Sequence, residues 1–346
     1  MKTYAAVLAS VITIVAILGG VFITKVAALS SPERYFQKGK RSYEIENYQE
    51  AINNLNEYLS IDSRTRPVNN IAESYFMVAD SLKKLKKYSL AKERLTSIIN
   101  NTNFSVYSTN AILAYADIAR LENHADPYIM SKLQENLKAS DSDIASKINI
   151  QYGYQLFLQK KYGEALSYFL RYDGELAVLG RARVYFNMNE YDRAFETYED
   201  FLKYNKTSVY YDEVVRTYLI QVPAMAHKTF VETNYTKSRM YYTKIAELFP
   251  RTEHAENALF RIAQSYYNEK NYNRAIDYYN KVRLNNIYTL DAEALLYIGL
   301  SYFKVGRYAD SYKALDNFIS EYPSNPNASK AREYMQALQE TLLTIN

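Results

Sequence analysis

The sequence contains no cysteine and no tryptophan, and it has only nine glycines, seven prolines and three histidines among 346 residues. Without cysteine the chain has no disulfide framework, no thiolate zinc site and no lipid-carrying cysteine of a bacterial lipoprotein. So few glycines and prolines leave little room for long disordered linkers. The histidines, His124, His227 and His254, are scattered along the chain and form no obvious metal-ligand cluster.

Motifs of common catalytic sites are missing as well. There is no GxGxxG, no GxxxxGK(S/T) phosphate loop and no GxSxG nucleophile elbow. We therefore expect no enzymatic activity and no cofactor. The 42 basic and 38 acidic residues nearly cancel, and no strong basic stripe stands out, so we expect no nucleic-acid binding.

Near the N-terminus, one segment is long and uncharged. Residues 4–24, YAAVLASVITIVAILGGVFIT, would span roughly 30 Å as a helix, which is the thickness of a hydrocarbon core. This predicts a transmembrane signal anchor, with a tail at 1–3 and a linker at 25–31. A cleaved signal peptide is the alternative, because Val26-Ala27-Ala28 resembles a cleavage site, but the apolar run is longer than a signal peptide requires.

The orientation of this anchor follows from two opposing signals. Lys25 and four further basic residues up to Arg41 follow the span, and charge counting alone favours a cytoplasmic body. Large downstream domains often cross regardless of charge, however, and a short tail with one lysine, Lys2, is typical of a signal anchor. We expect a single-pass protein of the inner (cytoplasmic) membrane whose body lies in the periplasm.

One sequence pattern recurs seven times along the rest of the chain. Its copies include ENYQEAINNLNEYL, NEYDRAFETYEDFL and KNYNRAIDYYNKV, and they align on a shared tyrosine: Tyr48, Tyr88, Tyr162, Tyr191, Tyr235, Tyr272 and Tyr308. Three residues later each copy has a small residue: Ala51, Ala91, Ala165, Ala194, Ser238, Ala275 or Ser311. Nine residues before the tyrosine stands another: Gly39, Ala79, Gly153, Ala182, Ala226, Ala263 or Gly299.

Small residues at both places predict pairs of antiparallel helices that approach closely, with the tyrosine covering the seam near their turn. A large residue stands seven positions after each tyrosine: Leu55, Leu95, Phe169, Tyr198, Tyr242, Tyr279 or Leu315. We expect it to face the next pair, because that spacing returns to one face of the second helix. Each pair would then leave an apolar flank that only a stacked neighbour can bury.

This pattern resembles the tetratricopeptide repeat, most clearly at Leu259–Val282 and Leu295–Pro323. The resemblance implies an all-α fold, a TPR-like α-solenoid in which about eight helix–turn–helix repeats over 32–343 form a right-handed superhelix. The family's tryptophan in the first helix is replaced here by Tyr35, Tyr75, Leu259 or Leu295, and its closing proline is present only at Pro250 and Pro323.

Three segments depart from the regular spacing. The interval from Tyr88 to Tyr162 is about twice the usual one, which predicts a degenerate repeat at 108–140. The interval from Tyr191 to Tyr235 is also long, and we expect an added helix at 208–221, after which Pro223 kinks or reopens the chain. The amphipathic segment 327–343 is expected to cap the open end of the stack.

In the family, the first helices of successive repeats line a concave groove that binds protein or peptide partners. Mapping those inward positions by register gives a candidate partner groove: Phe36, Lys40, Phe76, Ile150, Tyr154, Phe157, Leu179, Arg183, Phe186, Phe260, Gln264, Tyr267, Leu296, Tyr297 and Phe303. An aromatic row of this kind suits a partner helix or an extended peptide. Several of these aromatic residues, among them Phe157 and Tyr267, could instead pack within the stack. The asparagines with which some relatives grip an acidic C-terminus are absent, so we do not expect chaperone-tail binding.

Together these features predict a non-enzymatic, membrane-tethered scaffold that docks proteins during assembly of a bacterial envelope complex. The design is also similar to that of collar proteins around periplasmic flagellar motors. A glycan- or peptidoglycan-binding module is a further alternative, since sugars stack on tyrosine faces. Self-association into a homo-oligomer through the open lateral surface is an additional option.

Overall fold

The computed structural model describes residues 32–62, 66–137, 142–285 and 287–345. In these residues the chain forms seventeen α-helices and one short 3-10 helix, and it has no β-strand. By its internal contacts the chain divides into two compact units, residues 1–188 and residues 189–346, called unit 1 and unit 2 below. The expectation of an all-α repeat fold is confirmed.

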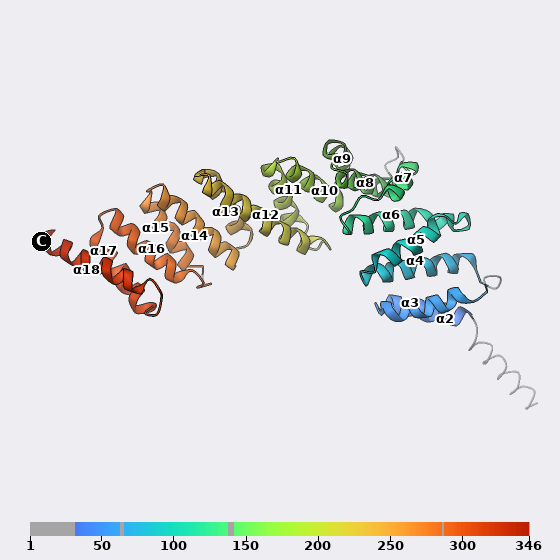
Figure 1. Cartoon of the computed structure of the whole chain (residues 1–346), viewed down its shortest axis with the longest axis horizontal. Helices are drawn as coiled ribbons and strands as arrows, with labels where there is room; N and C mark the ends of the chain where they lie inside the picture. The colour runs from blue at the N-terminus through green and yellow to red at the C-terminus, as the bar shows by residue number, and fades with distance from the viewer. Residues whose placement is uncertain (1–31, 63–65, 138–141, 286, 346) are drawn as a thin grey trace, which may run out of the picture. The chain divides into compact units, whose positions relative to one another are not determined.

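Helices follow one another with short connections in both units (Figure 1). Unit 1 contains α2 (Pro32–Glu44), α3 (Tyr48–Ser60), α4 (Val68–Lys84), α5 (Tyr88–Ile99), the 3-10 helix η2 (Thr102–Phe104), α6 (Ser105–Leu121), α7 (Pro127–Glu135), α8 (Asp143–Leu158), α9 (Tyr162–Phe169) and α10 (Glu175–Asn187). Unit 2 contains α11 (Tyr191–Tyr204), α12 (Tyr211–Val231), α13 (Tyr235–Leu248), α14 (Glu253–Asn268), α15 (Tyr272–Arg283), α16 (Asp291–Lys304), α17 (Tyr308–Glu321) and α18 (Ala328–Ile345). Up to α17, even-numbered helices are the first and odd-numbered helices the second of each pair.

The shared tyrosine is the first residue of its helix in all seven copies, from Tyr48 of α3 to Tyr308 of α17. In five copies its ring contacts an aromatic ring in the last turn of the preceding helix. The ring pairs are Tyr43–Tyr48, Phe157–Tyr162, Phe230–Tyr235, Tyr267–Tyr272 and Phe303–Tyr308, with centroids 5.2–6.3 Å apart. The tyrosine therefore covers the seam next to the turn, as its position in the motif predicts.

The turn itself is repeated with the same backbone conformation. Two residues before each tyrosine the chain has positive φ, between 59° and 64° at six non-glycine positions and 77° at Gly306. At Lys270, for example, the amide donates to the Tyr267 carbonyl (3.0 Å), and the Asn271 amide donates to the Tyr266 carbonyl (2.9 Å). These bonds satisfy the last carbonyls of the first helix and reverse the chain within a few residues.

Close helix approach at the small residues is visible in atomic distances. A Cβ atom added to Gly39 would lie 2.5 Å from Cγ of Leu55, and one added to Gly299 would lie 2.7 Å from Cδ2 of Leu315. Where serine replaces alanine on the second helix, its hydroxyl bonds across the seam: Ser311 Oγ donates to the Gly299 carbonyl at 2.8 Å. The large residue after the tyrosine thus packs on the small residue of its own pair, a contact that the expectation did not include. Phe169 also lies against Gly180 of the following helix α10, in the direction expected.

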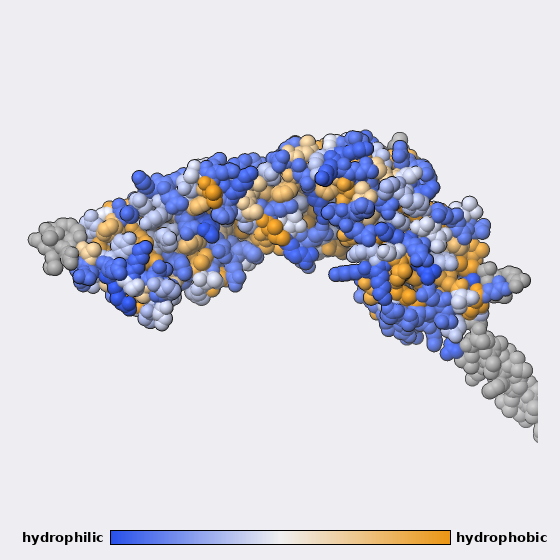
Figure 2. Space-filling view, in the orientation of Figure 1, coloured by the Kyte–Doolittle hydropathy of each residue, from blue (hydrophilic) through white to orange (hydrophobic). Residues whose placement is uncertain are grey.

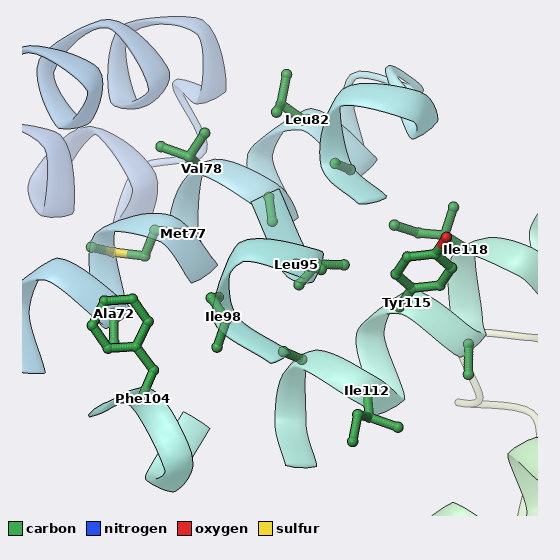
Figure 3. Close-up of a cluster of buried hydrophobic side chains, with 14 of the residues drawn as sticks. Ala72, Met77, Val78, Leu82, Leu95, Ile98, Phe104, Ile112, Tyr115 and Ile118 are labelled. Carbon is green, nitrogen blue, oxygen red and sulfur yellow. The ribbon is translucent and has the colours of Figure 1, made fainter. Parts of the chain in front are cut away.

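Hydrophobic side chains from successive helices form continuous layers between the pairs. Figure 3 shows one such layer, in which the labelled side chains of α4, α5, η2 and α6 converge: Ala72, Met77, Val78, Leu82, Leu95, Ile98, Phe104, Ile112, Tyr115 and Ile118. The extensive helix contacts in each unit join helices that are adjacent or one apart in the chain. This is the contact pattern of a solenoid, in which each pair is stabilised by its neighbours.

The segment predicted as an added helix at 208–221 has a different structure. Its residues form the first half of α12, which runs without interruption from Tyr211 to Val231 and contains Pro223. α12 packs against α13 as the first helix of a pair, so the long interval between tyrosines reflects one long helix. Proline lacks an amide hydrogen, and the Leu219 carbonyl therefore loses its usual helical donor.

No helix of the described residues is both long and apolar enough to cross a bilayer. The predicted anchor at 4–24, together with the tail at 1–3 and most of the linker that flanks it, lies outside those residues.

The seam makes a prediction about glycine. Replacing Gly39→Ala places a methyl group against Leu55 and should lower the free energy of unfolding by about 1–3 kcal/mol. Gly163→Ala is the matched control, because no atom lies within 4 Å of the added methyl, and its better helix propensity should raise stability by up to about 1 kcal/mol. Urea unfolding followed by circular dichroism measures both. Equal stability of the two variants would contradict close packing at Gly39.

Candidate functional site

The predicted groove residues divide into two groups by burial. Six are buried in the core of their unit and offer a partner almost no surface: Phe36, Ile150, Tyr154, Leu179, Phe260 and Leu296. The other nine are partly exposed: Lys40, Phe76, Phe157, Arg183, Phe186, Gln264, Tyr267, Tyr297 and Phe303. They lie on one surface of the first helices, at or beside three positions of each helix: three residues before the small residue, one residue after it and four residues after it. This surface is called the first-helix face below.

In unit 1, charges on the first-helix face pair with one another. Lys40 of α2 contacts Glu73 of α4 at 3.0 Å. Lys83 of α4 contacts Asp117 of α6, and Arg120 donates to the same carboxylate at 2.6 Å. Burial alone would raise the pKa of Asp117, but the positive charges of Arg120 and Lys83 outweigh it and hold the pKa below its usual value.

The polar and aromatic groups of Tyr154 are also contacted by side chains and backbone of the same chain. Its hydroxyl donates to the Leu176 carbonyl at 2.8 Å, and its ring is only 1% exposed. The guanidinium groups of Arg120 and Arg183 lie 5.6 and 5.9 Å from the ring centroid. These contacts occupy the middle of the predicted groove in unit 1 with the chain's own side chains.

In unit 2, an aromatic cluster covers the face of α14 and α16. Tyr297 stacks on Tyr279 with centroids 5.4 Å apart and meets Tyr267 edge-on at 5.5 Å. Phe260 completes the cluster against both Tyr279 and Tyr297. Burial raises the pKa of Tyr279, whose hydroxyl has no hydrogen-bond partner in the structure. The cluster packs α14, α15 and α16 together and leaves Tyr267 and Tyr297 partly exposed.

The first-helix face of unit 2 is open between α12 and α14. A cavity of about 400 Å³ lies there, within the range of known ligand sites, and is called the α12–α14 cavity below. α12 contributes Leu219, Pro223, Ala224 and His227; α13 contributes Tyr242 and Ile245; α14 contributes His254, Asn257, Ala258 and Arg261. The surface in Figure 2 is largely hydrophilic and is broken by smaller apolar patches over both units.

Pro223 widens the cavity at this pair. It stands three residues before Ala226, where the other first helices place Phe36, Phe76, Ile150, Leu179, Phe260 or Leu296. The proline ring is smaller than any of the aromatic, isoleucine or leucine side chains at that position. The space that a large side chain would fill therefore remains open.

Sequence reasoning missed the cavity residues because it assigned α12 to a separate helix. Counting from Ala226 in the repeat register places Pro223 and His227 on the first-helix face, because Pro223 is three residues before the small residue and His227 is one residue after it. That signal was available in the sequence. His227 and His254 line the same cavity because α12 and α14 are neighbours in the folded chain, and the sequence alone does not reveal this.

The side chains that line the cavity are of two kinds, apolar groups and hydrogen-bond donors. Across the described ranges, no three histidine, aspartate or glutamate side chains come together so that they could hold a metal ion.

Three segments match the sequence profile of the tetratricopeptide repeat: 176–208, 257–286 and 293–325. These three segments are therefore tetratricopeptide repeats, a kind of module that generally binds protein or peptide partners. No curated protein matches the chain.

Solved structures of repeat proteins are similar at low identity. The TPR domain of P58(IPK) is 15% identical over 91% of this chain and 99% of that one, with a TM-score of 0.33. The TPR2AB domain of yeast Sti1, solved in a complex with pHSP90, is 13% identical over 89% and 97%, with a TM-score of 0.31. The C-terminal part of a TPR repeat-containing protein from Cytophaga hutchinsonii is 16% identical over 86% and 98%, with a TM-score of 0.41.

The ion pairs of unit 1 predict an acid-sensitive contribution to stability. Asp117→Asn should lower the free energy of unfolding at neutral pH by about 1–3 kcal/mol, because Lys83 and Arg120 lose their common carboxylate. A carboxyl group whose pKa is lower in the folded than in the unfolded state stabilises the folded state at pH values above its unfolded pKa of about 3.9. The difference in the free energy of unfolding between Asp117→Asn and the unsubstituted protein should therefore vanish as the pH falls through the folded pKa.

The control for this experiment is Asp143→Asn, which removes an exposed pair with Lys147 and should change stability by less than about 0.5 kcal/mol. Urea titrations at several pH values measure both variants. A constant difference between Asp117→Asn and the unsubstituted protein down to the lowest pH would contradict the assignment.

Proposed function

We propose that this chain is a membrane-tethered, non-enzymatic scaffold that docks a segment of a partner protein in the α12–α14 cavity. The observation that carries the proposal is the contrast between the two units. Lys40, Lys83 and Arg120 on the first-helix face of unit 1 contact carboxylates of the same chain, whereas the face between α12 and α14 is open and lined by donors and apolar surface. An open, partly apolar depression with a few polar groups is the usual form of a binding site.

The proposal includes the membrane and the cell envelope. The uncharged run at 4–24 would hold the repeats at the inner membrane, with the body on the periplasmic side. A repeat body fixed to the bilayer at one end can hold a bound partner near the membrane while an envelope complex assembles. This role needs binding surface and no catalytic group.

Protein docking is favoured over glycan binding by the state of the tyrosines. Tyr154 is buried, and one ring face of Tyr297 is covered by Tyr279 at an interplanar angle of 18°. Sugars bind across open aromatic faces, and Tyr154 presents none while Tyr297 has one face covered. An acyclic segment that inserts side chains fits the α12–α14 cavity better.

Site-specific crosslinking tests the docking site. A photoreactive benzoyl-phenylalanine in place of Asn257, an exposed residue lining the cavity, should crosslink a partner protein in native membranes. The same group in place of Lys313, exposed on the second helix α17, should not. Equal crosslinking from both positions would contradict the proposal.

Pro223→Leu provides a matched variant that separates loss of binding from loss of fold. Leucine matches Leu179 and Leu296 at the equivalent position, narrows the cavity and restores a helical amide. We expect the free energy of unfolding to rise by about 1–3 kcal/mol and crosslinking from position 257 to fall to background. A stabilised variant that still crosslinks as before would show that the cavity is not the site.

The anchor is tested by extraction and proteolysis. With residues 4–24 intact, the protein should stay in the membrane pellet after alkaline carbonate washing, whereas a chain starting at residue 32 should be released. The body should be digested in spheroplasts, once the outer membrane is opened. Release of the full chain by carbonate would contradict the anchor, and digestion only after the inner membrane is breached would contradict the periplasmic orientation.

A further inference from the structure

One edge of unit 1 lies where the N-terminal segment joins the repeats. The first helices run in the same direction, so α2, α4 and α6 all begin at this edge. Asn70 in the first turn of α4 donates to Glu33 in the first turn of α2 at 3.4 Å, and η2 contacts both α4 and α6. Figure 3 shows Phe104 of η2 against Ala72 of α4. The surface formed by residues 67–71 and 97–106 is called the α4–α6 edge below.

The α4–α6 edge carries no charged side chain. Residues 67–72 and 95–116 contain no lysine, arginine, aspartate or glutamate, although 23% of the residues of the whole chain are charged. Arg66 at its border is held in place by the Tyr58 carbonyl, to which it donates at 2.6 Å. The exposed polar residues of the edge are asparagine, serine and threonine. Such a surface can approach lipid headgroups without the cost of removing water from a charge.

Two aliphatic side chains are exposed on this neutral surface. Val68, the first residue of α4, is 48% exposed, and Val106 in the first turn of α6 is 80% exposed. The opposite edge of unit 1 also exposes Ile45 and Leu85, but the turns that carry them, 44–47 and 83–87, contain glutamates or lysines around the apolar residue. Exposed aliphatic side chains without neighbouring charges therefore distinguish the α4–α6 edge from the opposite one.

The chain that precedes α2 determines what lies near this edge. The predicted anchor ends at residue 24 and α2 begins at Pro32, so residues 25–31 extend at most about 25 Å. α2 has 13 residues and is about 20 Å long, so the turn at Ile45 is farther from the point of attachment than the first turn of α2 is. A short tether keeps the lipid surface at high effective concentration, and weak apolar contacts are then sufficient for binding.

We infer that the α4–α6 edge lies on the surface of the bilayer, with Val68 and Val106 inserted among the lipid headgroups. It rests on the proposed anchor at 4–24 and adds a second contact with the membrane. Aliphatic side chains enter the boundary between headgroups and acyl chains, while the asparagine, serine and threonine side chains around them remain hydrated. The second contact fixes the orientation of unit 1 relative to the bilayer, which one anchoring helix alone does not.

The natural absence of cysteine allows a direct test. Asn103→Cys, exposed on η2, is labelled with the fluorophore NBD in the full-length protein, which is reconstituted into phosphatidylcholine–phosphatidylglycerol vesicles. Lipids that carry a nitroxide at the top of the acyl chain should quench the label by about half or more, because it lies at the depth of the headgroups. The same label at Ile45→Cys, exposed on the opposite edge, is the matched control and should keep its emission.

The variant Val68→Ser/Val106→Ser tests the two inserted side chains. Both residues are exposed, so the fold should persist by circular dichroism, while nitroxide quenching of the label at position 103 should fall at least about twofold. Ile45→Ser/Leu85→Ser removes aliphatic side chains from the opposite edge and should leave that quenching unchanged.

Equal quenching at positions 103 and 45, no quenching at 103, or quenching that Val68→Ser/Val106→Ser does not alter would overturn the inference. A blue shift of the label at 103 that depends on protein concentration but not on nitroxide lipid would assign the edge to a second copy of the chain instead. If the full chain then still stays in the vesicles after carbonate washing, the anchor stands and only the second contact is wrong. Release of the full chain would remove both, and crosslinking from position 257 is independent of either result.

Discussion

Close packing of a large side chain on a glycine or alanine of the facing helix is the constraint from which the rest of the structure follows. Leu55 lies against Gly39, Phe169 against Gly153 and Leu315 against Gly299, each at distances that leave no space for a Cβ atom on the glycine without movement. Two helices can pack at short interaxial distance only where such small residues let the backbones approach. The tight turn with positive φ and the tyrosine that begins the second helix then fix how the two helices meet.

This geometry also determines where function can be placed. A pair of helices packed in this way buries its seam but leaves flanks that only neighbouring pairs cover, so the core extends along the chain instead of closing around a central pocket. Binding then uses the outer faces of the helices. Unit 1 uses its first-helix face for internal pairs such as Lys83–Asp117, and unit 2 leaves His227 and Arg261 available at its face.

Sequence spacing was sufficient to predict the helix pairs, because the small residues and the tyrosine act within one pair at fixed separations. It was a weaker guide to the groove. Register identifies the face on which Phe260 or Tyr154 lies, but burial depends on what its own pair and the next pair place over it. Tyr279 of the same pair and Tyr297 of the next pair cover Phe260, and Arg183 of the next pair lies over Tyr154. The proline rule was misleading for α12, since packing of the long helix against α13 maintains it through Pro223 despite one lost hydrogen bond.

Pro223 is the point at which this repeat departs from the others, and it lies at the proposed docking cavity between α12 and α14. At the position three before the small residue, a large side chain such as Phe36 or Leu179 closes the space between successive first helices in other pairs. Proline at this position gives up a backbone hydrogen bond and much of that packing, which reduces local stability. The space that remains is lined by Arg261, His227 and His254, so the position that weakens packing in this pair is also the position that leaves these side chains accessible.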